Sequence, residues 1–521
     1  MTQRERILFL TTAAAALALR AAAYFRYRFD SDEQQHLHVT WGWTAGLVQY
    51  RDLFDNHAPL FHLLTAPLLA LLGERSDILL WMRAPMLVLF AIVLWATYTI
   101  AQRIYDQRVA VGAVLLLVLF PPFFLKSLEY RNDNLWAALW IVAVVALLRQ
   151  RMFIAGLLLG AALATSLKTV PLVIALAIAS AVLWVLRRTP HPPSAPSPLV
   201  EGRRLLLGFV LVPAAVIALF VSLGAWDELV YCNFTFNANF TRTRPHLWIG
   251  RAAFPITFGA LLWLAWRFRA TTDATRYFLA IAGGAYVVVL AGWWPVISPR
   301  DFLPVMPFGA MFVSAAIMRS ANAARTFAIV IVLSIAALWH YADRFENKTD
   351  WHITMMDQAL RLTRPGEMLI DYKGETIYRQ RPFYYALELV TRTLISRNLI
   401  RDTLAEDVIR TRTHVAQADG PMWPPRGRAF LSQNFVNLGR LRASGQAIRE
   451  DGTFTIAVPG EYVIVTERGE ARGVLDGTPY SGARELGSGT HLWMGEKKAT
   501  VLWAPAFRRG HSPYHLRDLD F

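Results

Sequence analysis

The chain has 521 residues, of which 55% are hydrophobic and only 17% are charged. So apolar a composition is rare in a soluble protein of this length and excludes an ordinary soluble globular fold. The net charge of +15 does not indicate nucleic-acid binding, because the basic residues lie in short clusters between long apolar blocks. The single cysteine, Cys232, excludes an internal disulfide.

About eleven membrane-spanning helices are predicted within the first 342 residues, because apolar blocks of about twenty residues are typical of such helices. The first block resembles a signal peptide, but Arg20 and the lack of a clean cleavage site favour a retained helix. The predicted spans are near residues 7–26, 79–102, 109–126, 134–149, 152–167, 169–187, 205–223, 251–268, 277–294, 302–318 and 325–341.

Short basic loops mark the cytoplasmic side of a membrane. Placing Arg4 and Arg6 inside puts every basic cluster between the spans on the same side. The loops that then lie outside the cytoplasm are 27–78, 126–133, 224–250 and 295–301.

Two of the loops have features of their own. In the first outer loop, Gln34–Val48 is expected to form a helix along the membrane, and Leu60–Leu72 an interfacial or re-entrant helix. The proline-rich inner loop Arg187–Arg204 is expected to be a flexible linker without chemistry.

The composition becomes that of a soluble protein after Tyr341, and an odd number of spans places this part outside. Helices are expected around Tyr384–Ile395 and Asp402–Thr411, within and after a mixed α/β stretch at Arg361–Ser396. Three alternating or apolar runs punctuated by turns indicate a small β-sandwich: Phe454–Val458, Glu461–Val465 and Thr500–Trp503. The predicted fold is therefore an α-helical polytopic membrane domain, 1–342, followed by an extracytoplasmic α/β plus β-sandwich domain, 343–521.

The first outer loop concentrates carboxylates and histidines beside a very apolar protein, where charged groups are costly unless they serve a function. A positioned carboxylate can accept the proton of an acceptor hydroxyl. Asp32 is the candidate base and Glu33 its neighbour on the acceptor side. Asp30 is an alternative base, and N-capping of the following helix is an alternative role for either aspartate.

Cations on the outer side run against the positive-inside trend and are candidates for binding a phosphate. Arg300 and Lys168 are the main candidates, although Lys168 could instead extend its ammonium to the membrane surface. Arg131 either pairs with Asp133 or binds phosphate, and His57 either contacts phosphate, orients the base or caps an interfacial helix. Contact with the acceptor or organisation of the loop is expected for Asp55, Asp133 and His36.

A metal site is the alternative for part of this loop, because carboxylates and imidazoles at close spacing can hold a divalent cation. Its ligands would come from Asp30, Asp32, Glu33, His36 and His38. The prediction is that no metal or other cofactor is required, with a divalent cation left possible. The sequence also has no glycine-rich loop of the kind that binds the phosphates of a nucleotide.

The Asp32-Glu33 pair followed by Asp55–Leu60 resembles the GT-C superfamily of membrane glycosyltransferases, in particular the protein O-mannosyltransferases and the lipid A aminoarabinose transferase. These families carry an Asp-Glu pair early in the first outer loop, and the mannosyltransferases follow it with Asp-x-His-x-Pro-Leu. The resemblance extends to Glu129–Asp133 and to Pro299–Pro304, where Asp301 replaces the usual aromatic residue. It spans about residues 1–340.

The resemblance implies a glycosyltransferase of the cell envelope, in the inner membrane of a bacterium, with its active site and C-terminal domain outside the cytoplasm. It would transfer a hexose or pentose from a polyprenyl phosphate carrier to a glycan, lipid or protein acceptor. Single displacement at the anomeric carbon would invert its configuration. A transporter or flippase of lipid-linked saccharides is the alternative function, and a non-catalytic assembly protein is a third.

Overall fold

The computed structural model describes residues 2–187, 198–241, 253–267, 275–294, 296–417 and 422–516. The chain falls into two compact units. The helical unit comprises Met1–Glu33, Asn56–Thr65 and Leu79–Thr349, and the sheet unit comprises Gln34–Asp55, Ala66–Ile78 and Asp350–Phe521. The sheet unit thus takes in two pieces of the first outer loop, and the domain boundary between residues 342 and 343 stays a prediction.

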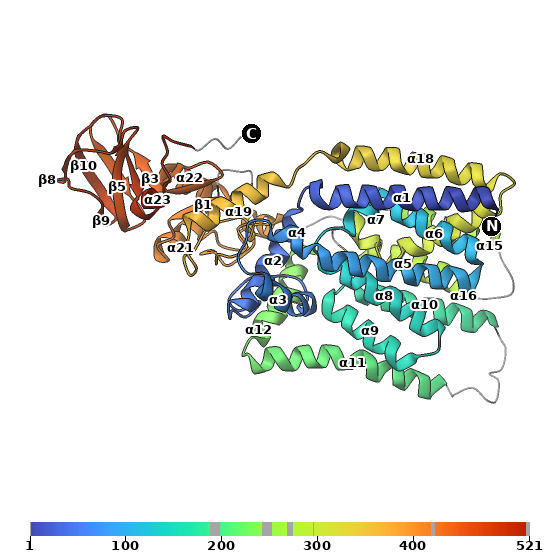
Figure 1. The fold of residues 1–521 in the computed structure, drawn as a ribbon. Coiled ribbons are helices and arrows are strands. Elements are labelled where there is room, and N and C mark those ends of the chain that lie inside the picture. The colour runs from blue at the N-terminus through green and yellow to red at the C-terminus, as the bar shows by residue number, and fades with distance from the viewer. Residues whose placement is uncertain are drawn as a thin grey trace. The chain divides into compact units, whose positions relative to one another are not determined.

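Helices that lie side by side form the helical unit (Figure 1). Their bounds are α1 Gln3–Arg26, α4 Ile78–Met82, α5 Ala84–Ile104, α6 Gln107–Leu119, α7 Pro121–Lys126, α8 Asn132–Leu148, α9 Met152–Thr165, α10 Thr169–Arg187, α11 Pro198–Ser222, α12 Trp226–Val230, α13 Phe236–Thr241, α15 Ala253–Arg267, α16 Thr275–Trp293, α17 Met306–Met318 and α18 Ala323–Tyr341. Shorter turns are the π-helix η1 Tyr231–Thr235 and the 3-10 helices η2 Pro299–Phe302 and η3 Asp343–Phe345.

Each predicted apolar segment coincides with helix in the part of the chain that the structure describes. Among the described residues, five helical stretches are long and apolar enough to cross a membrane: Gln3–Arg26, Ile78–Ile104, Val200–Ser222, Thr275–Trp293 and Ala323–Tyr341. Other apolar helices of 10–17 residues accompany them, so the number of eleven spans stays a prediction. Most of the predicted linker, residues 188–197, lies outside the described residues, as do residues 242–250 of the third outer loop.

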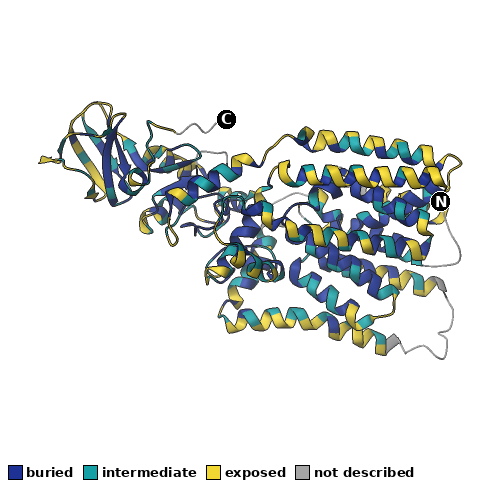
Figure 2. Cartoon of the chain, viewed as in Figure 1, coloured by how far each residue is buried: buried dark blue, intermediate teal, exposed yellow. Residues whose placement is uncertain are grey.

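The outer faces of the helical unit are apolar. Figure 2 shows exposed residues along α1, α11 and α18 and buried residues on the helices between them. Leu17, Leu207 and Val332 are 72%, 63% and 64% exposed, whereas Trp136 and Trp140 on α8 are buried. An apolar surface around an apolar core is expected where the surrounding solvent is lipid, and it supports the prediction of a membrane domain.

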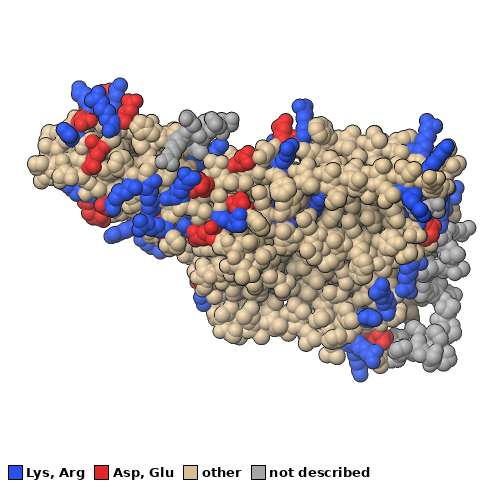
Figure 3. Space-filling model, viewed as in Figure 1, with Lys and Arg blue, Asp and Glu red and all other residues tan. Residues whose placement is uncertain are grey.

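Charged side chains are sparse on the face of the helices seen in Figure 3, and Lys and Arg gather at the end that carries the N-terminus. This distribution agrees with the predicted orientation, in which the N-terminal end of the bundle is cytoplasmic. The orientation itself stays a prediction.

The first outer loop contains two helices, α2 Ser31–Thr44 and α3 Leu60–Leu72. The helix α3 has the predicted bounds, whereas α2 begins three residues earlier than predicted. The earlier start follows from Asp30, whose carboxylate accepts a hydrogen bond from the backbone nitrogen of Asp32 at 3.1 Å and so caps the helix.

The sheet unit combines helices with two antiparallel sheets (Figure 1). Its C-terminal helices are α19 Asp350–Leu362, α20 Leu389–Ser396, α21 Leu404–Arg410, α22 Pro425–Asn434 and α23 Ala504–Arg508. Its strands are β1 Val415–Gln417, β2 Phe435–Asn437, β3 Leu441–Ala447, β4 Thr453–Ile456, β5 Gly460–Thr466, β6 Gly469–Glu470, β7 Gly473–Leu475, β8 Thr478–Pro479, β9 Arg484–Leu486, β10 Gly489–Gly495 and β11 Thr500–Trp503.

One sheet has the order β1-β3-β11-β5-β6, with β2 on β3 and β9 on β5, and the other has the order β4-β10-β7-β8. Phe454 and Trp493 from the second sheet share a hydrophobic core with Val463 and Leu502 from the first. The C-terminal sheet region that the sequence predicts is therefore present.

The predicted helix at Tyr384–Ile395 is too long, since α20 begins at Leu389. Phe383 and Leu387 are buried in a core of the sheet unit, and the backbone nitrogen of Leu387 donates to the carbonyl of Tyr372 at 2.6 Å. Tertiary contacts thus hold this segment in an irregular path despite its helical pattern.

Candidate active site

A cluster of ionised side chains lies where several helices of the helical unit begin or end. Asp30 and Asp32 are at the start of α2, Asp133 is in the first turn of α8, and Lys168 is between α9 and α10. We call this group the charged cluster; its members are Asp30, Asp32, Lys126, Glu129, Arg131, Asp133, Lys168, Arg300 and Asp301. Five carboxylates therefore face four cations.

Arg131 joins three of the predicted carboxylates. Its Nε donates to Asp133 at 3.0 Å, and its Nη1 contacts Asp32 and lies 3.4 Å from Asp30. Burial lowers the pKa of Arg131, but the surrounding carboxylates outweigh burial and hold that pKa well above its ordinary value. Arg131 is therefore a permanent cation at the centre of the cluster.

Arg300 is the second guanidinium of the cluster. Its Nη2 lies 2.6 Å from Asp30, its Nη1 lies 3.6 Å from Asp32, and its Nε donates to Glu129 at 2.9 Å. Glu129 is fully buried and also pairs with Lys126 at 2.6 Å. Burial raises the pKa of Glu129 above its ordinary value despite these two cations.

Lys168 bridges two buried carboxylates, Asp133 at 3.0 Å and Asp301 at 2.5 Å. Asp301 also accepts a hydrogen bond from the backbone nitrogen of Ser298 at 2.6 Å, which caps η2. The aspartate found in place of the usual aromatic residue thus fixes both the ammonium of Lys168 and the turn that carries Arg300.

Glu33 has a buried partner outside the charged cluster. Arg83, at the junction of α4 and α5, donates to its two carboxylate oxygens at 2.7 and 2.9 Å, and both side chains are fully buried. Glu33 also accepts from the backbone nitrogens of Asp30 at 2.9 Å and Tyr130 at 2.8 Å. Its carboxylate ties α2 to two other segments of the helical unit.

The three acidic residues at the start of α2 therefore differ in their partners. Asp30 and Glu33 form a reciprocal pair of capping bonds, each carboxylate accepting from a backbone nitrogen at the helix start. Burial raises the pKa of Asp30, but Arg300 and Arg131 outweigh it and hold that pKa below its ordinary value. The side chain of Asp32 is 24% exposed against 14% for Asp30.

The remaining predicted residues lie elsewhere. His57 is half-buried, three residues before α3 in the helical unit. Asp55 and His36 are buried in the sheet unit, where Asp55 accepts from Gln49 at 2.8 Å and Gln35 at 3.5 Å. Within the described residues, no group of three or more His, Cys, Asp or Glu is arranged to hold a metal ion.

Sequence reasoning missed Arg83, Lys126 and the pairing role of Glu129. Arg83 had a usable signal, because it is a lone cation within the apolar run Leu79–Ala101, and such a cation needs a partner. Lys126 and Glu129 are three residues apart, an ordinary spacing that carries no such signal.

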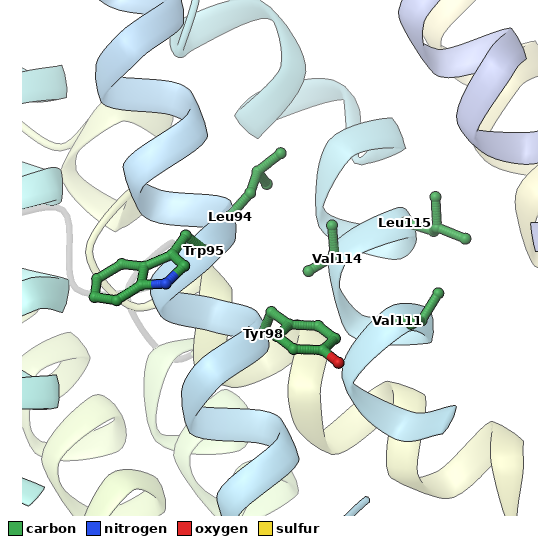
Figure 4. Close-up of a pocket in the computed structure, with 6 residues that line it drawn as sticks. All are labelled: Leu94, Trp95, Tyr98, Val111, Val114 and Leu115. Carbon is green, nitrogen blue, oxygen red and sulfur yellow. The ribbon is translucent and has the colours of Figure 1, made fainter. Parts of the chain in front are cut away.

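An apolar pocket of about 330 Å³ lies between α5 and α6. Both helices contribute the residues that line it, shown in Figure 4: Leu94, Trp95, Tyr98, Val111, Val114 and Leu115. None of these side chains is ionised, so the pocket offers neither a carboxylate base nor a cation for a phosphate, and the charged cluster is the stronger candidate for the active site.

Removing Arg83 should leave the buried carboxylate of Glu33 without the cation that balances its charge. We expect Arg83→Met to lower the free energy of unfolding by about 3–5 kcal/mol, as for other broken buried ion pairs. The double variant Arg83→Met with Glu33→Gln should recover much of that loss. Unfolding in detergent micelles measures both, and a single variant as stable as the native protein would show that the pair does not anchor α2.

No family model and no curated protein matches this chain at a significant level. Among solved structures it is similar to ArnT from Cupriavidus metallidurans in the apo state, with a TM-score of 0.54 and 15% identity over 84% of this chain and 97% of that one. It is also similar to the same protein bound to undecaprenyl phosphate, with a TM-score of 0.56 and 14% identity over 83% and 97%.

The Archaeoglobus fulgidus oligosaccharyltransferase tethered to an acceptor peptide gives a TM-score of 0.46 at 11% identity over 98% of this chain and 77% of that one, which is too low to support an inference. At these identities the likeness to ArnT establishes the fold alone. The resemblance that the sequence predicts is therefore confirmed at the level of the fold, which this chain shares with ArnT.

Proposed function

We propose that this protein is a membrane glycosyltransferase that moves a sugar from a polyprenyl phosphate carrier to an acceptor outside the cytoplasm. The observation that carries the proposal is the charged cluster, in which Arg131 and Arg300 hold the carboxylate of Asp32 at the ends of apolar helices. The fold supports it, because ArnT has the same fold and is known bound to undecaprenyl phosphate.

A lipid-linked donor suits this chain for two reasons. Apolar helices can accommodate a polyprenyl chain in the plane of the bilayer, while cations at their ends can hold its phosphate. The guanidiniums of Arg131 and Arg300 and the ammonium of Lys168 can stabilise the negative charge that develops on the departing phosphate. No metal ion is needed for this stabilisation.

The cations of the charged cluster are occupied by carboxylates when no donor is bound, so a phosphate must compete for them. We propose that the phosphate takes over donors of Arg131 and Arg300 that contact Asp32. Asp32 is a better candidate for release than Asp30, because it is more exposed and Asp30 also caps α2.

Once released from the guanidiniums of Arg131 and Arg300, the carboxylate of Asp32 can act as a general base. The acceptor oxygen attacks the anomeric carbon as its proton passes to Asp32, and the bond from that carbon to the phosphate oxygen breaks. The electron pair leaves with the phosphate, facing the cations. This single displacement inverts the anomeric configuration.

The other predicted site residues take supporting roles in this proposal. Glu33 positions α2 through Arg83, and Asp133 and Asp301 position Lys168. His57 stays a candidate for contact with the phosphate or for orienting the base. Asp55 and His36 stay candidates for organising the first outer loop or contacting the acceptor.

The proposal includes the predicted location: an integral protein of a bacterial inner membrane, with the charged cluster and the residues after 342 outside the cytoplasm. The acceptor is a glycan, a lipid or a protein. A transporter of lipid-linked saccharides is the alternative, and it differs in needing the cations but no catalytic carboxylate.

Replacing Asp32 distinguishes a glycosyltransferase, which needs a catalytic carboxylate, from a transporter, which does not. Asp32→Asn keeps the size of the side chain and removes the base, so transfer should fall by about 10²–10⁴ while donor lipid still binds. Asp30→Asn is the matched control, because Asn caps a helix about as well as Asp and a smaller loss is expected. Turnover of donor by purified protein measures both.

Three other outcomes are informative. Normal turnover in Asp32→Asn with an inactive Asp30→Asn would move the base to Asp30. Normal turnover in both would refute the carboxylate mechanism and favour the transporter. Lack of donor binding in Asp32→Asn would show that this carboxylate binds or organises rather than accepts a proton.

The cations are tested by their effect on the donor. Arg300→Gln and Lys168→Gln should each weaken donor binding more than tenfold, since a charge-assisted hydrogen bond is worth about 1.5–3 kcal/mol. Arg361→Gln removes the same charge from an exposed pair on α19 and should bind donor normally. Unchanged affinity in both cluster variants would exclude them from the phosphate site.

A further inference from the structure

A second candidate binding site lies wholly within the sheet unit and does not involve the charged cluster. It is a cavity of about 320 Å³, lined by Thr363, Glu367, Thr411, Arg412, His414 and Trp503 among others. This volume is at the lower end of the range for small-molecule sites, about 300–1,000 Å³. The cavity is therefore large enough for a ligand the size of one sugar.

Two aromatic rings contribute to the wall of this cavity, and the guanidinium of Arg509 lies over one of them, the ring of Trp503, at 5.2 Å from its centroid. The rings of His414 and Trp503 are stacked with centroids 5.0 Å apart and planes inclined by 8°. The Nδ1 of His414 hydrogen-bonds to Ser444 at 2.7 Å, and Ser444 in turn contacts the hydroxyl of Tyr462 at 3.1 Å. The imidazole is thereby held in one orientation.

The carboxylate of Glu367, which lines the cavity, already accepts three hydrogen bonds from within the protein. Glu367 accepts from two nitrogens of Arg509 at 2.8 and 2.9 Å and from the backbone nitrogen of Arg364 at 2.7 Å. Burial raises the pKa of Glu367, but Arg509 and Arg364 outweigh it and hold that pKa below its ordinary value. Its charge is balanced by Arg509, so it adds little acceptor capacity for a ligand.

Hydrogen-bond donors, by contrast, remain available. Arg412 is exposed, and in the described part of the chain it has no carboxylate partner. Burial lowers the pKa of His414 to about 4, so its ring is neutral near pH 7 and the positive charge of the cavity comes from Arg412.

An exposed cation with no carboxylate partner among the described residues, beside a carboxylate that is already neutralised, favours a ligand that carries a negative charge. We propose that this cavity binds a small acidic sugar, whose carboxylate or phosphate group pairs with Arg412 and whose remaining atoms lie beside the stacked His414 and Trp503. The proposal does not depend on the glycosyltransferase function, and failure of either leaves the other standing.

The test is calorimetric titration of the full-length protein in detergent with glucuronate, glucose 6-phosphate and glucose. At least one acidic sugar should bind with 1:1 stoichiometry, and glucose should bind at least about tenfold more weakly, equal to about 1.4 kcal/mol. Comparing the two acids distinguishes recognition of a carboxylate from recognition of a phosphate. Equal binding of glucose, or no binding of either acid, would refute the proposal.

Matched variants locate the binding. Arg412→Gln should weaken binding of the acidic sugar by about tenfold or more. Arg410→Gln removes the same charge two residues away, from an exposed pair with Asp407, and should bind as the native protein does. Native-like affinity in Arg412→Gln would place the acidic sugar elsewhere, including at the charged cluster, and would overturn the assignment.

Discussion

The structure depends on the balance of charges that are removed from water at the ends of the membrane helices. Isolated ions buried there would cost several kcal/mol each, and that cost is offset only by close partners of opposite charge. Arg131, Arg300 and Lys168 each contact at least two carboxylates. Helices that are otherwise apolar are thereby fixed relative to one another at one end, and the proposed function places the headgroup of the lipid donor at this end.

The partners of each carboxylate distinguish those that hold the structure together from the one proposed to take part in the reaction. The carboxylate of Glu33 pairs with Arg83 and accepts hydrogen bonds from backbone nitrogens. The carboxylate of Asp30 accepts the hydrogen bond that caps α2. Asp32 is held by the guanidiniums that a phosphate would need, and it is the most exposed of the three. An arriving phosphate would therefore exchange with Asp32 at the least structural cost, linking donor binding to release of the base.

Much of this fold follows from the sequence, because long apolar blocks and interrupted β patterns are local signals. The capping bonds of Asp30 and Glu33 were also available in principle, since Asp-x-x-Glu before a helix is a capping pattern. The sequence could not supply the pairing of Lys168 with Asp301, because 133 residues separate them and only the tertiary fold brings them together. In the sequence, Asp301 is only a departure from the usual aromatic residue, whereas the structure shows that its carboxylate anchors Lys168.

The central claim is that donor phosphate and Asp32 compete for the same guanidiniums. A structure of this protein with undecaprenyl phosphate bound, determined by electron cryo-microscopy, tests it most directly. The account predicts that the phosphate oxygens lie within about 3 Å of Arg131 and Arg300, with Asp32 moved off both. A phosphate bound away from these two arginines, with the contacts of Asp32 intact, would contradict it.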